Sequence, residues 1–83
     1  NKALEVEGVR MAVLASERDD GIKMSLRAVE PDTVNDIAVL FGGGGHAQAA
    51  GCTIHAPLHE ALDQVLAAMK DKLDKTPRPE GRV

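Results

Sequence analysis

The chain has 83 residues, enough for one small domain and too few for several. Hydrophobic residues make up 43% and charged residues 28%, as in ordinary globular proteins, and the single aromatic residue leaves the core to aliphatic side chains. The formal net charge of −3, with no block of Lys and Arg, argues against a surface that binds long nucleic acid by itself, although a few donors suffice for one or two phosphates.

The compartment is inferred from cysteine usage and hydropathy. Cys52 is the only cysteine, which excludes an internal disulfide and a cysteine metal cluster and suits a reducing, cytoplasmic environment. No apolar run is long enough to cross a membrane and no signal-peptide pattern is visible, so we expect no membrane partner. The chain begins at Asn1 rather than Met, and we expect it to be an excised piece of a longer protein.

A hairpin is predicted in the first third of the chain. Residues 9–16 are rich in β-forming side chains, and the Asp-Gly pair that follows is typical of a tight turn. Residues 22–28 alternate between apolar side chains and a polar set formed by Lys23, Ser25 and Arg27. We therefore expect two strands, the second with one buried face and one cationic, hydrogen-bonding face.

Helical periodicity begins after this hairpin. Asp32 or Thr33 can cap a helix whose apolar side chains fall within residues 34–41. The glycines at 42–45 end that helix. Residues 46–50 are compatible with a second, short helix.

The last part of the chain predicts a strand and a long helix. Residues 51–56 form a third strand, expected in the centre of the sheet. From Pro57, a suitable first helical residue, to about Lys75, apolar residues recur at helical spacing, and residues 76–83 are a flexible tail. The expected fold is α/β: one domain over residues 1–75, with a small mixed β-sheet packed by helices and a glycine-rich loop between a helix and a short helix and strand.

Four consecutive glycines, Gly42, Gly43, Gly44 and Gly45, each cost up to about 1 kcal/mol in a regular element relative to Ala. Their amides can converge on an anion, and a helix that begins near His46 would add free N–H groups. His46 can donate a hydrogen bond, more strongly when protonated. The alternative is a flexible loop with an exposed histidine, which the apolar segments on both sides of the run disfavour.

The segment FGGGGHAQAAG, residues 41–51, resembles the signature of the DHH-associated domain, the C-terminal domain of the DHH phosphoesterase family. IKMSLRA at 22–28 and TVNDIA at 33–38 resemble that family's second strand and following helix, in the expected order. The resemblance covers residues 9–72. The junction of the glycines with histidine is its specific part.

In such proteins an N-terminal DHH domain holds two metal ions, usually manganese, and hydrolyses phosphoester bonds with a metal-activated water. The C-terminal domain closes over the cleft and holds the nucleotide. The chain lacks the DHH motif, so the resemblance implies no metal site, cofactor or catalytic residue here and an inactive fragment. Its implied partners are the DHH domain of the same chain and short RNA or nucleotide phosphates. The members that it most resembles hydrolyse RNA of a few nucleotides and 3′-phosphoadenosine 5′-phosphate.

Residue by residue, the resemblance implies a phosphate cradle from the backbone of residues 42–45 and a phosphate or nucleotide contact from His46. Arg27, within SLR, is implied as a charge-assisted phosphate contact. Ser25 is a weaker candidate on the same strand face. Asn35 matches the helix position after the strand, and its alternative role is helix capping.

Other conspicuous residues have ordinary explanations. His55 and His59 are four apart, but Pro57 lies between them and position 55 is expected in a strand, so surface histidines are favoured over a metal pair. Cys52 is expected in the core. The leucine stripe of the last helix is expected to be core rather than a dimer seam, and the sequence sets no oligomeric state.

Three functions compete. The first is the substrate-binding domain of a phosphoesterase acting on short nucleotides; single-strand DNA exonucleases and cyclic-dinucleotide phosphodiesterases share this domain. The second is the C-terminal domain of an alanyl-tRNA synthetase, which should be more basic and usually lacks the Gly-His junction. The third is a stand-alone module that binds a small anion or a protein. The net negative charge and His46 favour the first function. Within that function, the net negative charge favours short substrates.

Overall fold

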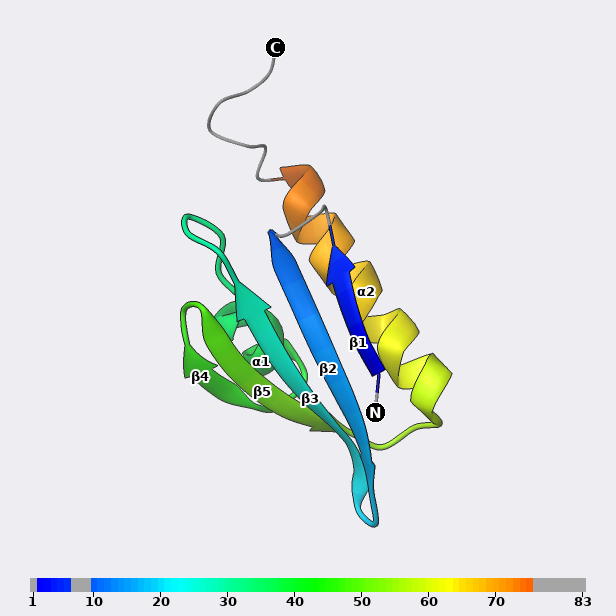
Figure 1. Cartoon of the computed structure of the whole chain (residues 1–83). Coiled ribbons are helices and arrows are strands. Elements are labelled where there is room, and N and C mark those ends of the chain that lie inside the picture. The colour runs from blue at the N-terminus through cyan, green and yellow to red at the C-terminus, as the bar shows by residue number, and fades with distance from the viewer. Residues whose placement is uncertain (1, 7–9, 76–83) are drawn as a thin grey trace.

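The computed structural model describes residues 2–6 and 10–75 of the chain (Figure 1). The elements follow in the order β1 (Lys2–Val6), β2 (Met11–Arg18), β3 (Gly21–Ala28), α1 (Asn35–Leu40), β4 (Gly44–His46), β5 (Ala49–Ile54) and α2 (Leu58–Lys75). The tail predicted at 76–83 lies outside the described residues.

The five strands form one sheet in the order β1-β2-β3-β5-β4, and each neighbouring pair is antiparallel. The predicted α/β layering is confirmed, but the sheet is antiparallel rather than mixed. Short connections join β1 to β2, β2 to β3 and β4 to β5, and they make these pairs antiparallel because parallel neighbours need a long crossover. β3 and β5 are antiparallel as well, although residues 29–48, with α1 and β4, lie between them. The strand predicted at 51–56 is an inner strand, as β5, although the middle of the sheet is β3.

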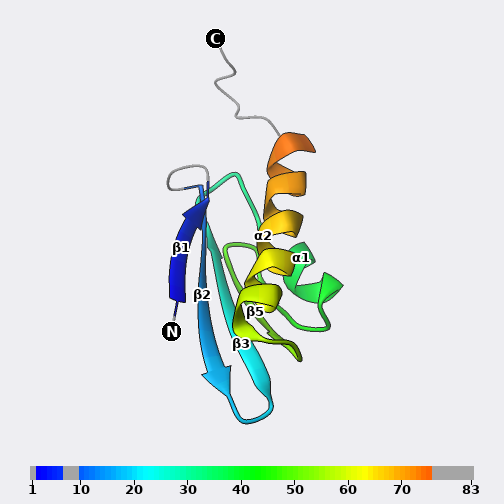
Figure 2. The same ribbon diagram turned by 90° about the vertical axis from the view of Figure 1, so that its right-hand side faces the viewer.

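Both helices cover the same face of this sheet, as Figure 2 shows from the side: α1 packs on β4 and β5, and α2 packs on β1 and β2. Alternate strand residues and one stripe of each helix meet between the layers in an aliphatic core. The expected burial of Cys52 and of the α2 stripe is confirmed. The opposite face of the sheet carries no helix among the described residues (Figure 2).

Two short strands differ from the prediction. β1 had no predicted counterpart, and the short helix predicted from His46 is wrong, because residues 44–46 form β4 and a turn at 47–48 leads into β5. A helix of five residues makes too few internal hydrogen bonds to be stable, whereas the same chain segment can complete a hairpin against an open strand edge. The hydrogen bonds between β4 and β5 therefore stabilise residues 46–50 more than the helix propensity of their alanines does.

The start of α1 also differs from the prediction. Its N-cap is Val34, without a side-chain cap hydrogen bond, so neither Asp32 nor Thr33 caps the helix. Both side chains have other partners: Arg10 donates to both carboxylate oxygens of Asp32, and Lys72 donates to the Thr33 hydroxyl. Asn35 is the first helical residue and is half-buried, not the cap.

Candidate functional site

The first two glycines of the run terminate α1. The Gly42 N–H donates to the Val39 carbonyl at 2.9 Å and the Gly43 N–H donates to the Ala38 carbonyl at 2.7 Å. With a φ of +87° at Gly42, this is the Schellman arrangement that closes helix C-termini. The structure therefore corrects the cradle of four free amides: those of Gly42 and Gly43 are used inside the chain.

Close backbone approach accounts for two of the glycines. A Cβ on Gly43 would collide with the carbonyl oxygen of Gly51, and one on Gly45, where φ is +147°, would lie 2.6 Å from the Cα of Ala50. Gly44 is different, because no atom lies within 4 Å of its Cβ position and its φ lies outside the left-handed region. The fold thus explains three glycines of the run and leaves Gly44 without a structural reason.

The strand register decides which side chains share the uncovered face. Directly opposed residues of paired strands project to the same side of a sheet. Arg27 is opposite Ala49, and Ala49 is opposite His46, so all three lie in one row on the face away from the helices. Two strand spacings separate the Arg27 and His46 backbones by roughly 10 Å. The two residues predicted to hold an anion therefore share one face, across an alanine.

The neighbouring rows extend this surface, which we call the open face. Ser25 is opposite Gly51, which is opposite Gly44, and Lys23 is opposite Thr53 in the next row. Gly51 and Gly44 present backbone rather than side chains at the centre of the open face. Small residues thus form a floor, and longer polar side chains surround it.

The charges on the open face contrast with the acidic chain as a whole. Lys23, Arg27 and His46 are all exposed there. By the register, no Asp or Glu of β2, β3, β4 or β5 projects to this face, and the described part of β1 adds only Glu5. A chain with net charge −3 therefore gathers cationic groups over its small-residue floor, which attracts anions.

A hollow of about 590 Å³ lies beside the glycine run. Its polar lining includes Lys23, Thr53 and His55, and it does not include Arg27 or His46. Arg27 lines hollows on the β1 and β2 side, and its Nη1 donates to the Leu26 carbonyl at 3.1 Å. Sequence reasoning missed Lys23 and His55; the alternation within residues 22–28 placed Lys23 on the right face, but no local signal marked His55.

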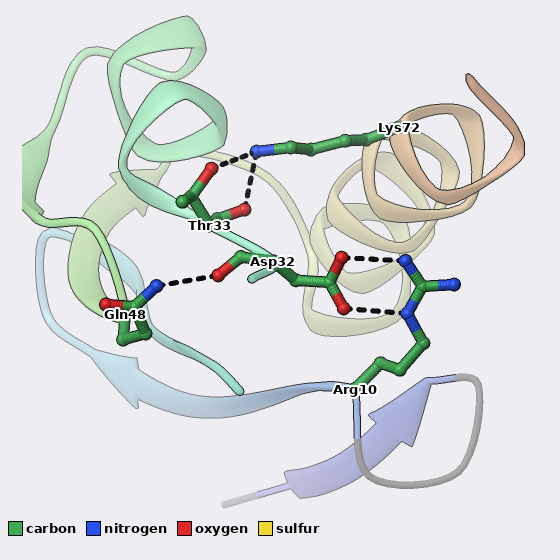
Figure 3. Close-up of polar contacts among 5 residues, drawn as sticks. All are labelled: Arg10, Asp32, Thr33, Gln48 and Lys72. Carbon is green, nitrogen blue, oxygen red and sulfur yellow. Dashed lines mark hydrogen bonds and ion pairs between the residues drawn. The ribbon is translucent and has the colours of Figure 1, made fainter. Parts of the chain in front are cut away.

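The turn that follows His46 is fixed by three hydrogen bonds to the last residue of β3 and to the segment that follows it. The Ala28 N–H donates to the Gln48 carbonyl at 3.1 Å, and the Val34 N–H donates to the Ala47 carbonyl at 2.7 Å. The Gln48 Nε2 donates to the Asp32 carbonyl at 2.8 Å (Figure 3). These contacts hold the β4–β5 turn, and with it His46, against the sheet.

Two cationic side chains, those of Arg10 and Lys72, also contact the segment that follows β3 (Figure 3). Asp32 is buried, and Arg10 contacts its carboxylate with two hydrogen bonds of 2.7 Å. Lys72 of α2 donates to the Thr33 carbonyl and hydroxyl and to the Asp36 carboxylate, each at 2.6 Å. Burial raises the pKa of Asp36 and the contact with Lys72 lowers it, with a net pKa below the ordinary value.

The described residues form neither a cluster of metal-ligating side chains nor a membrane-spanning helix. Within residues 2–6 and 10–75, no group of three or more His, Cys, Asp and Glu side chains could hold a metal ion. In the same part of the chain, no helix is long and apolar enough to cross a membrane. Burial raises the pKa of the Cys52 thiol, which keeps it protonated.

Comparison with known proteins gives consistent matches. The profile of the DHHA1 domain matches residues 1–75. A bifunctional oligoribonuclease and PAP phosphatase NrnA from Thermus thermophilus is 37% identical over 71 residues, which is 84% of this chain and 22% of that protein. Its counterpart of the same name from Bacillus subtilis is 32% identical over 65 residues, covering 78% and 20%. The chain spans about a fifth of the length of these relatives. It belongs to the DHHA1 domain family.

Proposed function

We propose that this chain is the substrate-binding domain of a metal-dependent phosphoesterase that hydrolyses short oligoribonucleotides and 3′-phosphoadenosine 5′-phosphate. Family membership and the names of the two similar proteins support a nucleotide-related phosphoesterase. The observation that carries the proposal is the row formed by Arg27, Ala49 and His46, in which two donors lie on either side of an alanine, on the face that carries no helix in the described part of the chain. The reduced single cysteine favours a cytoplasmic protein.

In this proposal Arg27 and His46 hold phosphate oxygens. The Arg27 guanidinium offers paired, charge-assisted donors that match a phosphate, and the imidazole of His46 adds a further donor. Gly44 leaves the space that a side chain would fill, so that the nucleotide can lie directly on the backbone. Since β4 is an edge strand, alternate residues between Gly44 and His46 direct their N–H groups away from β5 and add donors at the rim.

The bond-breaking chemistry belongs elsewhere in this proposal. The described residues do not fit a two-metal centre, because they contain no cluster of metal-ligating side chains. A DHH domain of the same protein, carrying two manganese ions, would supply the activated water. The open face would bind the nucleotide, orient it and exclude bulk water from it. The few cationic groups favour a substrate of a few nucleotides over a long strand, which needs an extended basic surface.

Binding by the 83-residue chain tests the proposal. In an NMR titration with 3′-phosphoadenosine 5′-phosphate, Arg27→Ala should weaken binding about tenfold through the loss of a charge-assisted contact. Lys70→Ala is the matched control, because Lys70 is an exposed cation on α2, behind the sheet. Equal affinities of the Arg27→Ala variant and the unchanged chain would contradict the role of Arg27 and the proposal with it.

A further inference from the structure

The hollow beside the glycine run is a second candidate site, at the sheet edge where β4 ends, and Lys23, Gly51 and Thr53 of the open face form part of its lining. It lies at the Lys23 end of β3, whereas Arg27 lies at the opposite end of that strand. Its lining combines one cation, two uncharged or titratable donors, one aromatic ring and bare backbone: Lys23, Phe41, Gly42, Gly43, Gly51, Cys52, Thr53 and His55. Among the described residues, no carboxylate lines it.

The hollow exists because β4 stops short. β4 pairs with residues 49–51 of β5, and the chain preceding it runs to α1 through Gly43 and Gly42. Residues 52–54 therefore have β3 as their one strand neighbour in the described part of the chain. Nothing lies within 4 Å of the Cβ position of Gly42, so its missing side chain and this strand edge leave room for a ligand, with backbone N–H and C=O groups at its margin.

The lining suits a nucleotide better than a simple anion. The exposed ammonium of Lys23 offers three donors for a phosphate, and Thr53 adds a hydroxyl. Phe41 is half-buried, packs against the core and lines the hollow, which places an aromatic side chain in its wall. Phe41 is also the only aromatic residue of the chain.

Strand geometry sets the distance between the two cations on β3. Arg27 and Lys23 are four residues apart, which corresponds to about 13 Å between their backbones. The 3′ and 5′ phosphates of one nucleoside are joined by six single bonds of about 1.5 Å, so they lie at most about 8 Å apart. Arg27 lines hollows on the β1 and β2 side, whereas Lys23 lines the hollow beside the glycine run. The two cations therefore serve different hollows, and a second nucleotide joined to the first is long enough to extend from one to the other.

We infer that the hollow receives the second nucleotide of a short oligonucleotide whose first phosphate is held at Arg27. Lys23 contacts the phosphate of that second nucleotide, and Phe41 contacts its base. This inference rests on the proposed function, because it assumes that Arg27 binds phosphate. By this inference Lys23 and Phe41, which lie outside the row of Arg27, Ala49 and His46, make the chain prefer a dinucleotide over a single nucleotide.

The test compares two probes on the 83-residue chain: 3′-phosphoadenosine 5′-phosphate and a 5′-phosphorylated diadenylate. NMR titration measures both affinities for the unchanged chain, Lys23→Ala, Arg27→Ala and the control Lys70→Ala, and circular dichroism checks that each variant is folded. Lys23→Ala should weaken the diadenylate about fivefold and leave the bisphosphate unchanged. Arg27→Ala should weaken both probes.

The outcomes separate the two proposals. If Arg27→Ala weakens both probes but Lys23→Ala weakens neither, the second-nucleotide site is wrong and the proposed function stands. If Lys23→Ala weakens both probes equally, Lys23 acts as a general cation and the length preference is wrong. If Arg27→Ala changes neither affinity, or the unchanged chain binds neither probe, both proposals fail.

Discussion

The two faces of the sheet differ in almost every property, although the same strands build both. On the face towards the helices, Met24 and Leu26 of β3 are fully buried. On the open face, Lys23 and Arg27 of the same strand are exposed. Because successive strand residues project to opposite sides, the residues of β3 that build the core alternate with those that we propose to bind the ligand. Substitutions on the two faces should therefore affect different measurements.

The largest effect is expected from adjacent residues of β3. Leu26→Ala removes a fully buried side chain and should lower the free energy of unfolding by about 3 kcal/mol through lost burial and a residual cavity. Arg27→Ala, one residue later but on the open face, should change it by less than about 0.5 kcal/mol. Urea denaturation followed by circular dichroism measures both. Similar losses for the two variants would contradict the separation of roles.

The fold was predictable where one segment carries its own periodicity. Residues 22–28 alternate strictly between apolar and polar side chains, and α2 has a long apolar stripe. Each pattern indicates which side chains are buried, even when the element that covers them is not known. β1 and β4 are short edge strands that depend on pairing with other segments, and their sequences contain no such pattern. The contact between Arg10 and Asp32 joins residues 22 positions apart, which local sequence cannot indicate.

The candidate site divides in the same way. Arg27 and His46 were identified by motif, and the register places them on one face. The expectation of four free glycine amides failed because the termination of α1 uses two of them, and that use depends on the three-dimensional path of the chain. Lys23 and His55 were missed because the hollow that they line exists only where β4 ends.

The glycine run offers a smaller and sharper test, since two adjacent glycines differ in their surroundings. Gly43→Ala places a methyl group against the backbone of Gly51 and Cys52 in β5, and should lower the free energy of unfolding by about 2 kcal/mol. Gly44→Ala meets no atom within 4 Å and should leave stability unchanged or raise it by up to about 1 kcal/mol. Thermal and urea denaturation compare the two variants.

Binding completes the comparison of these glycines. If Gly44 is a glycine so that a nucleotide can approach the floor, Gly44→Ala should weaken binding of 3′-phosphoadenosine 5′-phosphate while the chain stays folded. A Gly44→Ala variant with full affinity would show that the ligand does not lie over this position. If Gly44→Ala lowers the free energy of unfolding as much as Gly43→Ala does, the fold itself, and not the ligand, requires glycine at position 44.

The smallest effect is expected outside both faces, at the contact between α1 and α2. Asp36 is 61% exposed, and its carboxylate accepts a hydrogen bond from Lys72 at 2.6 Å. Burial raises the pKa of Asp36, but the Lys72 contact and the backbone hydrogen bonds of Asp36 and Ile37 together outweigh it, and the net pKa falls below the ordinary 3.8. A lowered pKa stabilises the folded chain above the unfolded-state value, and this contribution disappears as the pH falls through the folded-state pKa.

Asp36→Asn should therefore lower stability at pH 6 by at most a few tenths of a kcal/mol, since exposed ion pairs contribute little, and the difference from the unchanged chain should be smaller at pH 3, below the ordinary pKa of 3.8. Urea denaturation at both pH values measures it, with Asp74→Asn as a control for removal of an exposed carboxylate from the same layer. A loss at pH 6 as large as that of Leu26→Ala would mean that the contact of Lys72 with α1 contributes to the fold as strongly as the covered face does. The separation between a stabilising face and a binding face would then be incomplete.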